Sequence, residues 1–152
     1  MKITDITATP LATGKSLVRV QTDAGVEGWA EGPGINKVVP GRNGSVFNAY
    51  LETIIKPVLI GENPLDIDRH WETLATGKDD RLYKLPASVV GIIDVALWDL
   101  LGKETGKPVY TLMGGAARTT IPLYWSVGSG WRMQPEEMVD LVKNGWDMGF
   151  RA

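Results

Sequence analysis

An apolar stripe between residues 87 and 104 constrains the fold of this chain more than any other feature of its sequence. Apolar side chains recur there at the helical spacing i, i+3, i+4, i+7, i+8 and i+11, at Val89, Ile92, Ile93, Ala96, Leu97 and Leu100. Residues at this spacing share one face of an α-helix, and a face without a polar break has to be buried. We therefore predict a core helix from about Ala87 to Glu104, ended by Gly102 and Gly106-Lys107-Pro108.

The segments before this helix predict a sheet and two further helices. The stretch SLVRVQT (16–22) alternates apolar and polar residues, and Asp23-Ala24-Gly25 supplies a turn before VEGWAE (26–31). With KITDITATPL ahead of it, this pattern is typical of a three-stranded antiparallel meander. Helical patterns follow from Val46 to about Leu59 and from Pro64 to about Leu74. Residues 1 to about 115 are thus predicted to form an α+β unit, and a chain of 152 residues that is 43% hydrophobic can bury such a core.

The last part of the chain has a different pattern. The run TIPLYWSVGSGW (120–131) is strand-like from Ile121 to Val127 and then enters a glycine-rich turn. A helix is predicted over 135–148, because Pro135-Glu136-Glu137 suits a helix start and Gly149 suits a left-handed terminator. Phe150 and Arg151 resemble the first residues of another strand. Such alternation of strand and helix is typical of a parallel sheet or an α/β barrel.

Charge and composition exclude several classes of function. The 16 basic residues are dispersed and the net charge is -2, whereas a nucleic-acid surface needs clustered Lys and Arg. No apolar run approaches the length of a membrane span and no leader is evident, so we expect no membrane partner and a cytoplasmic location. The absence of cysteine excludes disulfides, thiolate zinc sites and cysteine nucleophiles.

The segment SVVGIIDVALWDLLGKETGKPVYTLMGG (88–115) carries a more specific signal. It resembles the end of the N-terminal capping domain in the enolase superfamily, in the mandelate racemase and muconate lactonizing enzyme branch. The opening strands and LIGENPLDIDRHWETL (59–74) fit the same family, so the resemblance covers nearly the whole chain. The residues that carry it in 88–115 are Asp94, Ala96, Leu97, Trp98, Asp99, Gly102, Lys103, Gly106, Pro108, Val109, Tyr110, Leu112, Gly114 and Gly115.

The resemblance implies an architecture and a chemistry. Residues 1–118 would form the α+β capping domain, and 119–152 the first strand and helix of a TIM-like (β/α) barrel whose remainder we expect outside this chain. Members of the family abstract a proton α to a carboxylate and stabilise the product anion on Mg²⁺. The implied protein is an acid-sugar dehydratase, a racemase or a cycloisomerase that forms a homo-oligomer when full length.

No catalytic or metal-binding residue can be carried over from the family to this chain. The Lys-x-Lys motif of the base would follow position 152, and no two lysines here have that spacing. The Mg²⁺ ligands would come from later barrel strands. The fragment alone is therefore expected to be inactive.

The family resemblance instead places this chain's contribution in two substrate-closing loops and one strand end. The loops would be Pro10 to Ser16 and Gly32 to Gly44, and residues at the strand end face either the pocket or the neighbouring strand. The candidates that could contact a small carboxylate substrate such as an acid sugar are Lys15, Asn36, Lys37, Arg42, Trp125 and Ser126.

Other polar residues have simpler interpretations. His70 is expected to pair with Asp66 on its own helix or to be exposed. Asp94 and Asp99 lie about 140° apart on a helix and so share no face; Asp94 is expected to make the hydrogen bond that tethers or caps its helix.

A free-standing α+β binding module is the alternative to an enzyme part. The two hypotheses differ in whether Ile121 to Tyr124 is paired in a closed sheet. The enzyme hypothesis predicts a strand without a partner in this chain.

Overall fold

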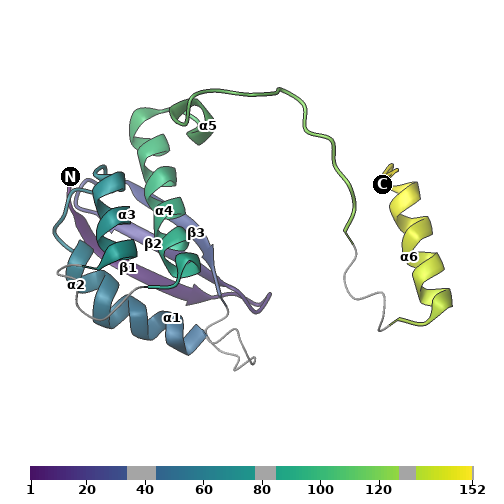
Figure 1. The fold of residues 1–152 in the computed structure, drawn as a ribbon, viewed down its shortest axis with the longest axis horizontal. Helices are drawn as coiled ribbons and strands as arrows, with labels where there is room; N and C mark the ends of the chain where they lie inside the picture. The colour runs from purple at the N-terminus through teal and green to yellow at the C-terminus, as the bar shows by residue number, and fades with distance from the viewer. Residues whose placement is uncertain (34–43, 78–84, 127–132, 152) are drawn as a thin grey trace. The chain divides into compact units, whose positions relative to one another are not determined.

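The computed structural model describes residues 1–33, 44–77, 85–126 and 133–151, and it divides into two compact units (Figure 1). The first is Met1–Gly115 and the second is Ala116–Ala152. Each unit is described by itself.

The first unit opens with the predicted antiparallel meander. Its strands are β1 (Ile3–Pro10), β2 (Ser16–Thr22) and β3 (Glu27–Gly32), in the order β1-β2-β3. Alternate residues of β2 are buried, as the period of a half-buried strand requires. In the register, Val20 lies opposite both Ile6 and Gly28.

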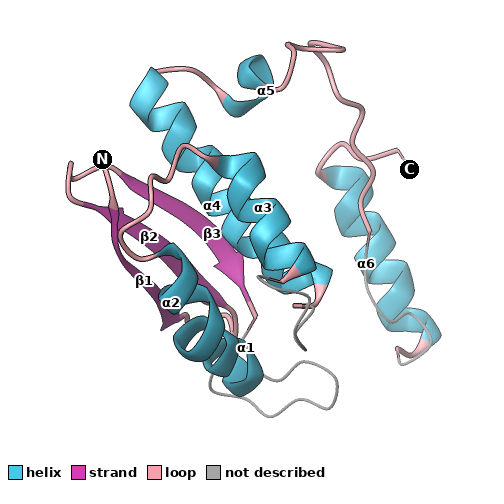
Figure 2. Ribbon diagram, turned by 60° about the vertical axis from the view of Figure 1, so that its left-hand side comes forward, coloured by secondary structure: helices cyan, strands magenta, loops and turns pink. Residues whose placement is uncertain are grey.

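Helices cover one face of this sheet (Figure 2). The first helical segment comprises α1 (Gly44–Tyr50), the π-helical turn η1 (Leu51–Ile55) and α2 (Lys56–Leu59). They are followed by α3 (Ile67–Thr76), α4 (Ala87–Thr105) and the short α5 (Val109–Leu112). The helix predicted from Pro64 begins at Ile67 instead, because Asn63 accepts a backbone hydrogen bond from Asp66 and closes a turn there.

The π-turn has a packing reason. Phe47, Leu51, Ile55 and Leu59 are buried and recur at every fourth residue. On a regular α-helix that spacing drifts by about 40° per step. A π-turn contains more residues per turn than an α-helix, so the turn at Leu51–Ile55 offsets this drift and keeps the four side chains directed toward the sheet.

The predicted stripe of α4 forms the centre of the core. Val89, Ile93, Ala96, Leu97 and Leu100 are buried, whereas Ile92 is partly buried at the margin. They pack with the buried strand residues Ile3, Ile6, Val18, Val20 and Ala30. The helix ends as predicted, because Gly106 has a φ of 64° and Lys107 donates a backbone hydrogen bond to the Gly102 carbonyl at 2.9 Å.

The second unit contains the predicted helix, α6 (Pro135–Asp147). A capping box begins it, in which the Gln134 backbone N–H bonds the Glu137 carboxylate at 2.9 Å. Gly149, with a φ of 96°, ends it as predicted.

The strand predicted over Ile121 to Val127 is absent from the described part of this segment, 116–126, which has no regular secondary structure. Ile121, Leu123 and Tyr124 are 70 to 74% exposed. A strand gains its hydrogen bonds only from a neighbouring strand, and the described residues of the second unit contain none. The closed sheet that would favour a free-standing module is therefore not observed among them.

Candidate functional site

Both candidate loops begin at the same end of the sheet. Pro10 lies opposite Ser16, and Ser16 lies opposite Gly32 on the next strand. The end of β1, the start of β2 and the end of β3 are thus adjacent. The connection 11–15 therefore lies beside Gly32, where the described part of β3 ends.

The first of these loops is a tight turn. Leu11 and Gly14 close it with backbone hydrogen bonds of 2.9 and 3.0 Å, and Gly14 adopts a φ of 81°. Lys15, at its end, forms an ion pair with Glu31 of β3, with 2.7 Å between Nζ and Oε1. Both side chains are well exposed, so the pair contributes little to stability. A competing carboxylate could replace Glu31 at small cost.

The base of the second loop needs glycine. A β-carbon on Gly32 would lie 2.5 Å from the Ser16 hydroxyl and 2.8 Å from Val18. Ser16 is fully buried, and its hydroxyl has no hydrogen-bond partner in the described structure. The candidates Asn36, Lys37 and Arg42 lie outside the described residues.

The two candidates of the second unit differ in their surroundings. Trp125 packs on α6, because Gly145 lacks a side chain and a β-carbon there would lie 1.9 Å from the indole ring. The indole also stacks with Phe150, with 6.0 Å between ring centroids. Ser126 is exposed. The sequence feature that could have indicated this packing is Gly145, a glycine inside the predicted helix.

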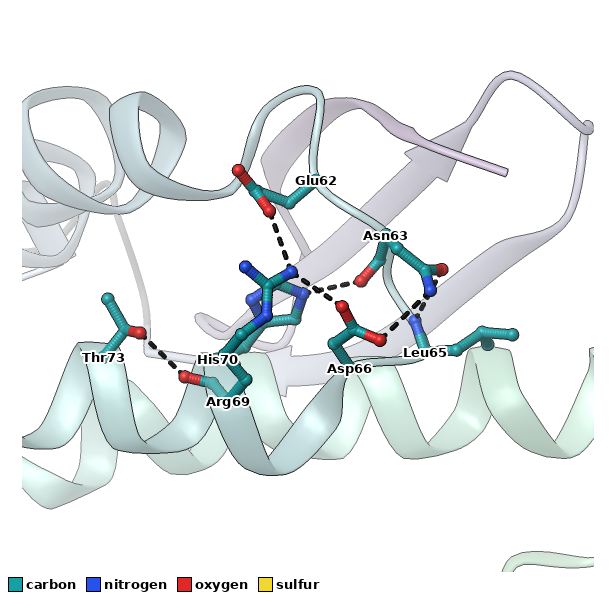
Figure 3. A network of polar contacts seen from close by, with 7 residues as sticks. All are labelled: Glu62, Asn63, Leu65, Asp66, Arg69, His70 and Thr73. Carbon is teal, nitrogen blue, oxygen red and sulfur yellow. Dashed lines mark hydrogen bonds and ion pairs between the residues drawn. The ribbon is translucent and has the colours of Figure 1, made fainter.

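His70 is neither exposed nor paired with Asp66, so that prediction is wrong. It is 2% exposed, and its Nε2 lies 2.7 Å from the Asn63 carbonyl oxygen (Figure 3). The Asp66 carboxylate instead bonds Arg69 at 2.7 Å and Asn63 at 3.1 Å. The two side chains have different partners because Asp66 lies at the start of the helix and bonds Asn63 and Arg69 there, whereas the His70 side chain is buried in the core.

The tether predicted for Asp94 is made by Asp99. Its carboxylate accepts a hydrogen bond from the Trp29 backbone N–H of β3 at 2.8 Å and contacts Lys103 at 2.6 Å. Asp94 instead lines a shallow depression between α3 and α4, together with His70 and Trp71. Burial there raises the pKa of the Asp94 carboxyl above its ordinary value of 3.8, and repulsion from Asp68 raises it further.

This environment predicts a pH-dependent gain from Asp94→Asn. A carboxyl with a raised pKa stabilises the fold only when protonated, so its contribution is present below 3.8 and is lost as the pH rises through the folded-state pKa. The variant should therefore need more urea than wild type to unfold at about pH 7, and the gain should shrink toward about pH 3.5. Asp68→Asn should shift stability in the same direction but less, because burial is the larger cause. An equal difference between wild type and Asp94→Asn at both pH values would contradict this assignment.

Two absences bear on the chemistry. Within residues 1–33, 44–77, 85–126 and 133–151, no group of three or more His, Asp or Glu side chains is arranged to hold a metal ion. In the same ranges, no helix combines the length and apolar character needed to cross a membrane.

Comparison with known proteins identifies the family. The family model of the mandelate racemase / muconate lactonizing enzyme N-terminal domain matches residues 6–114, which is more than half of the chain. The chain belongs to this family. The match ends just after α5, at the end of the first unit. The three-stranded sheet of this unit, followed by helices, is the family's N-terminal capping fold.

Relatives in this family are named as dehydratases. The D-galactonate dehydratase of Pectobacterium atrosepticum is 35% identical over 99% of this chain and 37% of its own length. A D-galactonate dehydratase family member of Streptomyces bingchenggensis is 35% identical over 89% of this chain and 31% of its own. The chain therefore spans about a third of the length of these relatives.

Solved structures show the same fold. A member of the enolase superfamily from Polaromonas sp. JS666 superposes with a TM-score of 0.71, at 28% identity, over 97% of this chain and 42% of that one. The 2-chloromuconate cycloisomerase of Rhodococcus opacus 1CP gives 0.78 at 24% identity, over 100% of this chain and 44% of that one. At that identity the cycloisomerase supports the fold alone. These relatives therefore include dehydratases and a cycloisomerase.

Proposed function

We propose that this chain is the substrate-covering part of an enolase-superfamily enzyme that dehydrates an acid sugar such as galactonate. The observation that carries the proposal is the pairing of Pro10, Ser16 and Gly32 across the three strands, which brings the two loops out at one end of the sheet. Loops that leave a rigid sheet together can close over one ligand. The D-galactonate dehydratases among the relatives supply the substrate class.

Substrate binding is the role of this chain in the proposal. Lys15 exchanges Glu31 for the substrate carboxylate, since the existing pair is exposed and weak. Asn36, Lys37 and Arg42 offer amide and cationic groups for the remaining oxygens of an acid sugar, and Ser126 offers a hydroxyl. Closing the loops excludes water, which strengthens these interactions. Because the Trp125 indole packs against Gly145 of α6, the role of Trp125 in the proposal is to hold the segment next to Ser126 in place.

The reaction itself needs groups that the described residues do not bring together. Proton abstraction α to a carboxylate requires a base and, in this superfamily, Mg²⁺ to stabilise the anion. The chain matches the family's N-terminal domain, so the proposal assigns both groups to a (β/α) barrel outside this chain. Residues 1–118 then form the cap and 119–152 the barrel's first strand and helix, in a protein that assembles as a homo-oligomer.

Two assays test the proposal. Residues 1–152 with Mg²⁺ and a panel of aldonic and aldaric acids should give no 2-keto acid product. A chimera in which residues 1–115 replace the matching segment of the Pectobacterium atrosepticum dehydratase should convert D-galactonate to the keto acid. The relative without its own cap segment is the control, and it should be inactive.

Two results would count against this function. Turnover by residues 1–152 alone would place the catalytic groups in this chain. A chimera that folds, as judged by circular dichroism, but performs no better than the relative without its cap would support the free-standing binding module instead.

A further inference from the structure

The free edge of β3 is bonded to side chains of α4. Among the described residues, β3 pairs with β2 on one side and with no strand on the other. The Trp29 N–H donates to the Asp99 carboxylate at 2.8 Å, and the Lys103 ammonium donates to the Glu27 carbonyl oxygen at 3.0 Å. Glu27 and Trp29 are two residues apart, so their backbone groups point to the same side of the strand. Both groups would otherwise be available to another strand.

The geometry points to Asp99 and Lys103 closing this edge by taking the place of one residue of a fourth, parallel strand. In a parallel ladder, a neighbour opposite residue i donates its N–H to the carbonyl of i-1 and accepts from the N–H of i+1. With Gly28 as residue i, the Lys103 ammonium provides that donor and the Asp99 carboxylate that acceptor. The two side chains are themselves joined, with 2.6 Å between Nζ and Oδ2.

Gly28 explains how a helix comes close enough to do this. A β-carbon at this position would lie 1.9 Å from the Ala96 carbonyl oxygen and 2.9 Å from the Leu100 β-carbon. The absent side chain lets the α4 backbone pack directly on the strand. Asp99 and Lys103, one turn apart on the helix, then reach the strand's edge on both sides of Gly28.

The closed edge has a consequence for self-association. Unpaired N–H and C=O groups along an edge strand are a template for pairing with another chain. A second copy of this chain presents the same β3 edge, so it is the occupant expected once Asp99 and Lys103 are removed. This inference concerns the first unit alone and does not depend on the proposed enzymatic role.

The test compares Asp99→Ala/Lys103→Met with a control at the C-terminal end of α4, Glu104→Gln/Lys107→Met, whose native side chains are exposed and form no hydrogen bond or ion pair with a described residue. Hydrogen exchange at the Trp29 amide, measured by NMR on residues 1–152 at a concentration at which the protein is monomeric, should accelerate about tenfold or more in the first variant and stay unchanged in the control. Light scattering over rising concentration should show a species of twice the wild-type mass for the first variant alone.

Folding is monitored separately in the same samples. The amides of Val18 and Val20, inside the sheet, should remain protected in both double variants. If the first variant unfolds, Asp99→Ala alone replaces it, and the same Trp29 acceleration is required. Wild-type exchange at Trp29, or an unchanged mass in a folded variant with an exposed Trp29 amide, would overturn the proposal.

Discussion

Replacing Gly28 by alanine should lower the free energy of unfolding of the first unit by about 3 kcal/mol. The added methyl would lie 1.9 Å from a backbone oxygen of α4, at Ala96, and neither element can move without disturbing the core between them. Inserting volume where backbone meets backbone forces the helix away from the sheet, which also withdraws Asp99 from the Trp29 amide. Urea unfolding followed through the NMR amide signals of Val18 and Val20 measures the loss as a lower midpoint.

Gly91→Ala is the matched control for this substitution. Gly91 lies on α4 itself, and a β-carbon there would meet nothing within 4 Å. Alanine favours a helix interior over glycine by up to about 1 kcal/mol, so this variant should be as stable as wild type or more stable. Similar losses for both variants would show that the Gly28 contact does not determine how closely the helix packs.

The parts of the fold that depend on local patterns could be predicted from the sequence. The stripe of α4 has a period of 3.6 and the strands a period of 2, and each period selects its structure without knowledge of the neighbours. Gly106 and Gly149 could be assigned as helix ends because only glycine adopts a positive φ there without strain. The start of α3 was missed by three residues because Pro64 suits both a first helical turn and a tight turn.

The polar contacts depend on tertiary register and could not be predicted. The sequence shows that Asp94 and Asp99 diverge on a helix, but only the packing of α4 on β3 decides that Asp99 meets the Trp29 amide. Lys15 and Glu31 are brought together by the pairing of β2 with β3, which a pattern along the chain does not contain. His70 has the same difficulty, because its partner is a backbone carbonyl at Asn63 rather than a side chain one turn away.

The strand expected over Ile121 to Val127 shows the converse limit. Its apolar residues are strand-like, but a strand is stable only beside another strand, and residues 121–126 form none. In the described residues of the second unit the neighbour is absent, and Ile121, Leu123 and Tyr124 stay exposed.

Leu97→Ala should destabilise the first unit by about 2–5 kcal/mol, the second large effect expected for this chain. Leu97 is 1% exposed and packs in the core at the middle of α4, beside His70 and Val90. Its removal leaves a cavity that the rigid helix and sheet can fill only partly, and alanine's favourable helix propensity offsets little of that loss. A domain has about 5–15 kcal/mol of stability in total, so the urea midpoint should fall steeply.

The control for Leu97 is its neighbour Val95, which lies on the same helix but is 55% exposed. Val95→Ala removes apolar atoms from a surface already in contact with water, so the free energy of unfolding should change by no more than about 0.5 kcal/mol. The contrast tests whether the face of α4 that carries Val95 is open to solvent. A large loss for Val95→Ala in residues 1–152 would mean instead that a second face of α4 is covered in solution, and light scattering on the same sample would show whether another copy covers it.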